Sequence, residues 1–196
     1  PYQVFDAEGL RVAVIGMANL SSLTSIFDSP NRLGITPLGT TQIAQAYIDL
    51  LRPHVDVVTV VSHLGLENDE ELIATTTGLD VVLGGHNHIV LQPPKRVNDC
   101  SANFDEEAGS FYVEVDGPES GTKMKRYCKP REVVLAHSGA FAKYVGRLDL
   151  VLSNAEEDLP EKCDPNKAQE QCYDPINGFE VLSSSFDLFA VNESVP

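Results

Sequence analysis

The sequence predicts an α/β fold in which buried parallel strands alternate with helices. Residues 55–63 and 79–86 are nearly continuous runs of β-branched and aliphatic residues, typical of strands that are buried on both faces of a sheet. Residues 68–78 between them have the pattern of a short helix that begins with an acidic turn and ends before Gly78. A strand–helix–strand unit with such short connections places its two strands side by side and parallel.

Three segments are expected before this unit. The stretches "PYQVF" and "LRVAVIGM" are strand-like and "DAEG" between them is turn-like, so residues 1–18 are predicted to form a hairpin. Residues 20–38 are rich in Ser, Pro, Asn and Gly and are predicted to be a loop. Residues 40–53 have apolar side chains at helical spacing, with a threonine as the cap and Pro53 as the end of the helix.

The rest of the chain is less regular. Residues 92–131 are polar and are expected to form an excursion from the fold that contains the hairpin "SFYVEVDG". Residues 131–153 return to strand character, and residues 154–178 are acidic and predicted to be a linker or a wrapping loop. The stretch that follows, "FEVLSSSFDLFAVNESVP", has apolar residues without a clear period.

Composition excludes two classes of protein. The formal net charge is −15, and an acidic excess of this size repels phosphate backbones, so a duplex nucleic-acid binder is not expected. No stretch of eighteen apolar residues occurs, so no transmembrane segment is expected either.

The four cysteines are expected to form disulfides. None lies in a C-x-x-C pair, which argues against a zinc ribbon or a thioredoxin-like motif. Of the three possible pairings, the sequential one closes two local loops in polar sequence and is preferred. It joins Cys100 with Cys128 and Cys163 with Cys172.

Disulfides indicate an oxidising compartment, and two glycosylation sequons agree with that. These are Asn19-Leu20-Ser21 and Asn192-Glu193-Ser194. Together with the cysteines they predict a secreted or cell-surface protein.

Three histidines follow the two strands of the strand–helix–strand unit. His63 ends the first strand, and His86 and His88 follow the second after two glycines, which permit a sharp turn and a close approach. Ligand sites in such sheets form outside the carboxyl ends of the strands, so the three histidines are expected to converge. Neutral imidazole is a common ligand of divalent metals, and in an extended stretch His86 and His88 would share one face.

Several alternatives compete with the metal site. The histidines could be merely exposed in a polar loop. "AHSGA" around Ser138 is similar to a nucleophile elbow but has alanines where G-x-S-x-G has glycines, so a serine hydrolase is the weaker hypothesis. The letters H-N-H do not make a nuclease motif, whose residues lie far apart in sequence, and the acidic charge opposes one. His54 and His137 are interpreted as structural.

The sequence also resembles a known family. "VVTVVSHLGLENDEELIATTTGLDVVLGGHNH" resembles the last two metal-binding blocks of the calcineurin-like metallophosphoesterases, and more narrowly those of the secreted 5′-nucleotidase branch. In this branch S-H-x-G follows a hydrophobic strand, and D-x-x-x-G-G-H-x-H comes after a helix. The opening hairpin and "HSGAFAKYVGRLDL" are similar to that branch as well, so the resemblance covers residues 1–153.

This resemblance implies a four-layer α/β/β/α sandwich that holds two divalent metal ions such as Zn, Mn or Fe. In the family the ions activate a hydroxide that attacks a small-molecule phosphate ester. Carried over by motif, His63 and His86 would bind one metal and His88 the other. The expected activity is hydrolysis of a nucleotide or related phosphomonoester, and the alternatives within the superfamily are a phosphodiesterase and a UDP-sugar hydrolase.

Other family motifs are missing from the sequence. D-x-H, a bridging Asp and G-N-H-E/D lie N-terminal to residue 1 in the family, which implies that this chain is the second half of the catalytic domain. Residues 1–153 would be its C-terminal part, with 92–131 as a disulfide-stapled excursion. Residues 154–196 would be the linker and lead-in to a following domain. No catalytic residue is then expected in this chain, and alone it would be inactive without the N-terminal half as partner. A non-catalytic secreted metal-binding or surface protein is the alternative from another class.

Overall fold

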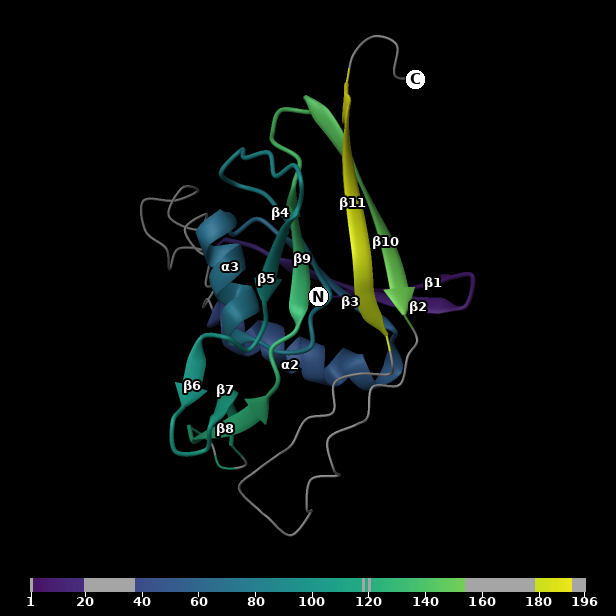
Figure 1. Ribbon diagram of the computed structural model, residues 1–196. Helices are drawn as coiled ribbons and strands as arrows, with labels where there is room; N and C mark the ends of the chain where they lie inside the picture. Colours follow the sequence, from purple (N-terminus) through teal and green to yellow (C-terminus); the bar gives the residue numbers. More distant parts are fainter. Residues whose placement is uncertain (1, 20–37, 118, 120, 154–178, 192–196) are drawn as a thin grey trace, which may run out of the picture.

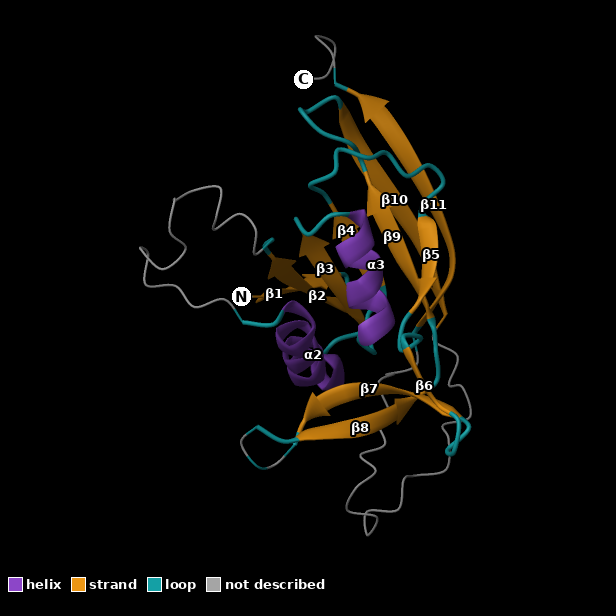
Figure 2. Ribbon diagram, turned by 90° about the vertical axis from the view of Figure 1, so that its left-hand side faces the viewer, coloured by secondary structure: helices purple, strands orange, loops and turns teal. Residues whose placement is uncertain are grey.

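A six-stranded sheet organises the protein. The computed structural model describes residues 2–19, 38–117, 119, 121–153 and 179–191. Two helices cover one face of the sheet, and a long two-stranded ribbon lies on the other side (Figures 1 and 2). The helices are α2 (Thr40–Leu51), which continues into the 3-10 helix η2 (Arg52–His54), and α3 (Leu66–Thr75). The order in the main sheet is β1 (Tyr2–Ala7), β2 (Leu10–Met17), β3 (Val57–Ser62), β4 (Val81–Gly84), β9 (Glu132–His137) and β5 (Lys95–Asn98). The mixed α/β class predicted from the sequence is confirmed.

The first four strands of the sheet follow the sequence prediction. β1 and β2 form the expected antiparallel hairpin, and Glu8 and Gly9 at its turn have φ angles of 56° and 94°. β3 lies parallel to both β2 and β4, and β4 lies parallel to β9. The predicted strand–helix–strand unit is therefore confirmed, and the carboxyl ends of β3 and β4 lie at the same edge of the sheet.

The hydrophobic core lies between the two helices and the sheet. Burial of this apolar surface is the main stabilising term, at roughly 25 cal/mol per Å². Every second residue of the strands points into this core, as the alternation of a pleated sheet requires. Its fully buried members include Ala13, Ile15, Ala44, Ile48, Val58, Val60, Leu72, Ile73, Val82, Val133 and Leu135.

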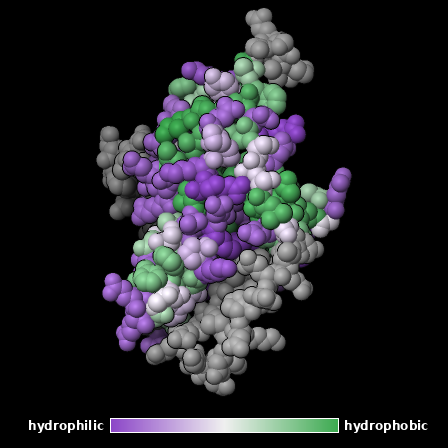
Figure 3. All heavy atoms as spheres, viewed as in Figure 1, coloured by the Kyte–Doolittle hydropathy of each residue, from purple (hydrophilic) through white to green (hydrophobic). Residues whose placement is uncertain are grey.

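The opposite face of the sheet is only partly covered, which differs from the expectation that these strands are buried on both faces. Val61 is 45% exposed and Leu83 is 37% exposed, and the two are direct neighbours in the register of β3 and β4. Figure 3 shows further hydrophobic side chains gathered over the β10–β11 ribbon, where Val151 and Leu182 are exposed. Apolar surface that faces water in this way marks a place where another element can pack.

The helix ends differ slightly from those expected. Gly39, rather than a threonine, is the N-cap of α2, and no side chain caps this end. Pro53 lies within η2, so the helix tightens there before it ends. The helix α3 begins at Leu66, two residues before the expected start, with Glu67 and Asp69 in its first turn. Within the described part of the chain, neither helix has the length and apolar character needed to cross a membrane.

The segment 92–131 is more than an excursion. Its first strand, β5, pairs antiparallel with β9 and forms an edge of the main sheet. The predicted hairpin is part of a separate three-stranded sheet of β6 (Asn103–Asp105), β7 (Ser110–Asp116) and β8 (Lys123–Cys128). A disulfide joins Cys100 to Cys128, the pairing preferred from the sequence. Arg126 of β8 makes a bidentate ion pair of 2.7 and 2.9 Å with Asp49 of α2, which docks this small sheet on the helix.

Of the two strands in the ribbon on the other side of the main sheet, the sequence predicts only the first. β10 (Tyr144–Ser153) lies in the segment of predicted strand character, but β11 (Glu180–Ala190) comes from the stretch without a clear period. The two strands pair antiparallel along their whole length, with an irregularity between Val151 and Leu152. A strand therefore exists in a segment that was expected to be a lead-in, while the division of the chain at residue 153 stays a proposal.

Some expectations lie outside the described residues. These are the loop at 20–37, the linker at 154–178, the pair Cys163 and Cys172 within it, and the sequon at Asn192.

A buried ion pair anchors the start of β4. The guanidinium of Arg52 contacts both carboxylate oxygens of Asp80, at 2.5 and 3.3 Å, and both side chains are buried. Asp80 also accepts a hydrogen bond of 2.8 Å from the backbone N–H of Val58 in β3, and Arg131 approaches it to 3.5 Å. One carboxylate therefore links η2, β3 and β4.

We predict that Arg52→Leu lowers the free energy of unfolding by about 3 kcal/mol, because it leaves the Asp80 charge buried with only the backbone N–H of Val58 and the longer Arg131 contact as partners. Equilibrium denaturation measures the change. The matched control is Arg147→Leu, whose ion pair with Asp149 is exposed and should contribute less than about 1 kcal/mol. Equal losses in the two variants would contradict the role given to the buried pair.

Candidate functional site

Two of the three candidate histidines meet at the edge of the sheet. His63 directly follows β3, and His86 follows β4 after one intervening glycine. Their rings lie edge to face, with centroids 5.1 Å apart, and both residues are exposed. The parallel pairing of β3 and β4 therefore brings together two imidazoles that are far apart in sequence, as the sequence predicted.

His88 lies apart from this pair. Its ring packs edge to face on Phe141, with centroids 4.6 Å apart, and Phe141 is itself 78% exposed. Among the described residues no group of three His, Cys, Asp or Glu side chains could hold one ion. The three histidines therefore do not form one cluster of metal-ligand geometry in the described part of the chain, and the assignment of His63 and His86 to one metal and His88 to the other stays a prediction.

Backbone conformation explains why the histidines separate. β4 ends at Gly84, and His86 and His88 have positive φ angles of 81° and 60°. In an extended stretch these two side chains would share a face, so the expectation from sequence spacing is wrong because the loop is not extended. Left-handed conformations cost energy in residues other than glycine and persist where surrounding contacts fix them, often at functional sites.

Asn87 and Gly65 fix this loop against the start of α3. The backbone N–H of Leu66 donates to Oδ1 of Asn87 at 2.6 Å, so the loop after β4 satisfies a free donor at the helix N-terminus. Gly65 has φ 98° and ψ 156°, a region that is essentially reserved for glycine. A Cβ at this position would lie 3.3 Å from Cδ2 of His86 and 3.2 Å from Cγ of Asn87.

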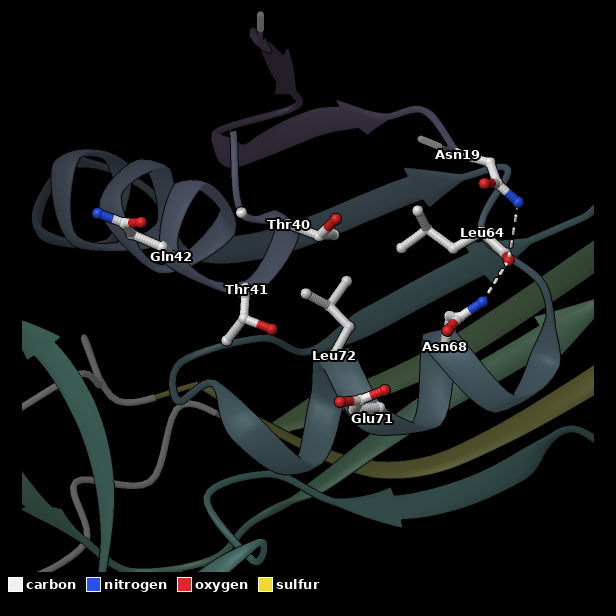
Figure 4. A pocket seen from close by; sticks show the side chains of 9 residues that line it. Asn19, Thr40, Thr41, Gln42, Leu64, Asn68, Glu71 and Leu72 are labelled. Atoms are coloured by element: carbon white, nitrogen blue, oxygen red, sulfur yellow. Dashed lines mark hydrogen bonds between the residues drawn. The ribbon is translucent and has the colours of Figure 1, made fainter. Parts of the chain in front are cut away.

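A cavity of about 440 Å³ lies on the helix side of the turn after His63, between the starts of α2 and α3 (Figure 4). The amides of Asn19 and Asn68 both donate to the carbonyl of Leu64 there, at 3.4 and 2.9 Å. These bonds support the turn that carries His63. Among the described residues that line it, Glu71 is the one charged group and none is cationic.

The remaining candidates have clear positions. Asn19 is half-buried and its side-chain amide donates to the carbonyl of Leu64; glycosylation there stays a prediction. Ser138 is half-buried at the end of β9, where it forms a bridge with Val90. His54 is exposed in η2, and His137 is buried and bonded to Asp69. Sequence reasoning gave no role to Phe141 or Asp69, since neither lies in a motif with recognised metal-ligand spacing.

We predict that Gly65→Ala lowers the free energy of unfolding by about 1–3 kcal/mol, the cost of a side chain in this backbone region. It should also disturb the chemical shifts of His86, because the added methyl group meets that ring and Asn87. Gly109→Ala is the control, since Gly109 also has a positive φ, 63°, but its Cβ would meet nothing within 4 Å. Denaturation and histidine-detected NMR measure both effects, and unchanged His86 shifts in Gly65→Ala would contradict the proposed contact.

Known proteins share parts of this sequence and its fold. No protein-family model matches the chain. The chain is 27% identical over 121 residues to the trifunctional nucleotide phosphoesterase protein YfkN of Bacillus subtilis, covering 59% of this chain and 8% of that protein. It is 28% identical over 151 residues to an apyrase of Tabanus yao and 24% identical over 157 residues to a 5′-nucleotidase of Diplobatis ommata. These matches cover 75% and 80% of this chain, and each covers 24% of the relative.

Two solved structures share the fold. The 5′-nucleotidase precursor from Thermus thermophilus matches 97% of this chain with a TM-score of 0.56 and 22% identity, over 29% of its own length. The calcineurin-like phosphoesterase YfkN from Bacillus subtilis matches 97% with a TM-score of 0.58 and 18% identity, over 50% of its length. The chain thus spans a quarter or less of the curated relatives described above. Its homologues and structural neighbours are 5′-nucleotidases and calcineurin-like phosphoesterases, so the resemblance of the sequence to this family is confirmed.

Proposed function

We propose that this chain supplies part of the metal site of a phosphoesterase that uses two divalent metal ions and hydrolyses a nucleotide or related phosphomonoester. The observation that carries the proposal is the pair of His63 and His86, whose rings meet at the carboxyl ends of two adjacent parallel strands. Sites in open α/β sheets form at that edge. The homologous hydrolases support the reaction class.

The two imidazoles are suitable ligands for one divalent ion, and the ion can reach them from solvent. Imidazole nitrogen suits Zn, Fe and related metals, and both side chains are exposed. Small residues keep the space around the rings clear, because a Cβ on Gly85 would lie 3.4 Å from Nδ1 of His63. The pair is half of a coordination sphere, since structural and catalytic sites take at least three protein ligands. His88 would hold the second ion.

In this proposal the protein residues bind and orient the ions rather than react. His63, His86 and His88 hold the ions, and the strained loop between Gly84 and His88 fixes the directions of two of the rings. When bound, such ions polarise a phosphate ester and stabilise the charge that develops during in-line displacement. Nucleotides are the favoured substrates because the relatives described above are named as a nucleotide phosphoesterase and a 5′-nucleotidase.

We further propose that the missing ligands come from an N-terminal half of the same catalytic domain. The exposed pair Val61 and Leu83 supports this, because it lies on the uncovered face of the sheet, two residues before His63 on β3. An element that covered this apolar face would lie beside the histidine pair. Two imidazoles without further ligands do not make a catalytic centre, so the chain alone is expected to be inactive.

The site is tested by removing one histidine at a time. We predict that His63→Ala and His86→Ala each lose the same metal ion, whereas His88→Ala mainly affects the other. Elemental analysis of the purified protein gives the stoichiometry, and His54→Ala is the control because this exposed histidine lies in η2, before β3 begins. Equal loss of both ions from all three variants, or a loss from His54→Ala, would contradict the assignment. Retained activity after Ser138→Ala in the protein that also contains the N-terminal half would dismiss the serine-hydrolase alternative.

A secreted or cell-surface location is a separate proposal. It is supported by the disulfide between Cys100 and Cys128 and by the two sequons at Asn19 and Asn192. Mass spectrometry of the natural protein should find oxidised cysteines and an N-linked glycan on at least one sequon. Fully reduced cysteines without any glycan would argue against this location.

A further inference from the structure

A buried cluster of polar side chains lies directly behind the histidine pair. Asp69 of α3 is 0% exposed and His137 at the end of β9 is 1% exposed, and Nε2 of His137 lies 2.9 Å from Oδ2 of Asp69. The hydroxyl of Ser62, the last residue of β3, donates to the other carboxylate oxygen, Oδ1. We call Ser62, Asp69 and His137 the carboxylate clamp. One side chain of α3 thereby joins the ends of two strands.

The clamp lies where the backbone no longer joins β3 to β4. Their register pairs end at Val61 and Leu83, so no backbone ladder between these two strands extends to His63 or to the loop that carries His86. Ser62 directly precedes His63 in the sequence. The clamp therefore supplies side-chain bonds at the position where the backbone bonds stop.

Gly84 connects the clamp to the loop of His86. A Cβ on Gly84 would lie 2.7 Å from Cε1 of His137 and closer still to Nε2 of His137 and Oδ2 of Asp69. The end of β4 thus lies directly against the bond between Asp69 and His137. The next residue, Gly85, lies against the other strand, since its Cβ would be 3.5 Å from the carbonyl oxygen of Ser62. A shift of the clamp would displace both strand ends that carry the histidine pair.

Packing alone does not explain this cluster. A buried carboxylate is costly unless it is hydrogen-bonded, and Asp69 needs both of its partners to remain there. His137 is only half satisfied, because among the described residues its buried Nδ1 has no hydrogen-bond partner. The unpaired nitrogen is a cost that an apolar side chain would not carry, so the role of the imidazole lies in its bond to Asp69. Its single bond holds Asp69 in one orientation against Gly84.

We propose that Asp69 and His137 are positioning residues that hold the His63 and His86 rings in the arrangement that binds the metal. This inference rests on the proposed function, because it concerns the same pair of ligands. Partners outside the ligand set commonly tune metal affinity, and their loss costs about 10-fold to 100-fold. Here the effect passes through the ends of β3 and β4 rather than through a direct bond to a ligand.

The test compares isosteric changes at the two ends of β4 in the purified protein that contains this chain. In Asp69→Asn the side-chain oxygen can still accept the hydrogen bond from Ser62. The NH₂ group then faces Nε2 of His137 in place of the carboxylate oxygen. Asp80→Asn makes the same change in the buried ion pair at the start of β4 and serves as the matched control. At His137, Leu removes the donor, whereas Gln keeps an N–H donor for Asp69 and should rescue the wild-type behaviour.

Three measurements are made on each variant. Titration with Co²⁺, followed by its visible absorption, gives the affinity of the histidine pair. NMR of ¹⁵N-labelled histidines in the metal-free protein reports the environments of His63 and His86 without any metal. Thermal unfolding of each variant measures the general loss of stability.

We expect Asp69→Asn and His137→Leu to bind Co²⁺ about 10-fold more weakly and to shift the His63 and His86 resonances. Asp80→Asn should keep the wild-type Co²⁺ affinity and histidine resonances, even if its melting temperature falls as much as that of Asp69→Asn. His137→Gln should match the wild type in both. Wild-type affinity and resonances in Asp69→Asn and His137→Leu would overturn the inference, as would an equal loss in Asp80→Asn. If the wild-type protein bound no Co²⁺ at this pair, the proposed function would fail, and the NMR comparison would still decide whether the clamp positions the rings.

Discussion

The parallel pairing of β3 with β4 is the constraint on which the rest of the structure depends. It sets the carboxyl ends of two strands side by side, so that His63 and His86 meet although they are far apart in the sequence. The hydrophobic core between the sheet and the two helices maintains this pairing along the strands. At their starts Asp80 links β3, β4 and η2, and at their ends Asp69 links β3 to β9 behind Gly84. A buried carboxylate at each end of β4 therefore supports the point from which the candidate ligands project.

Much of this arrangement could be predicted because it follows from local patterns. The β-branched runs at 55–63 and 79–86 identified β3 and β4, and the short connections between them required a parallel pair. The same reasoning placed His63 and His86 at one edge. The pairing of Cys100 with Cys128 is preferred among three possibilities because it closes a local loop in polar sequence, and the structure has this disulfide.

Other features depend on contacts that no local pattern records. β11 has no clear period because its ribbon is exposed to solvent over much of both faces, so burial does not impose an alternation on its sequence. The separation of His86 from His88 comes from left-handed backbone angles, which spacing rules for extended chains do not anticipate. Likewise, exposure of Val61 and Leu83 could not be read from a run that is apolar throughout. His137 was interpreted as structural, whereas its bond to Asp69 connects it to the candidate site.

The central claim is that His63 and His86 bind the same metal ion. The most direct measurement is anomalous diffraction from crystals of the protein that contains this chain, grown with Zn²⁺, at energies on both sides of the zinc absorption edge. The account predicts one anomalous peak within about 2.0–2.1 Å of a ring nitrogen of each histidine, the usual Zn–N distance. A protein in which zinc binds elsewhere, or binds only one of these two rings, would contradict it.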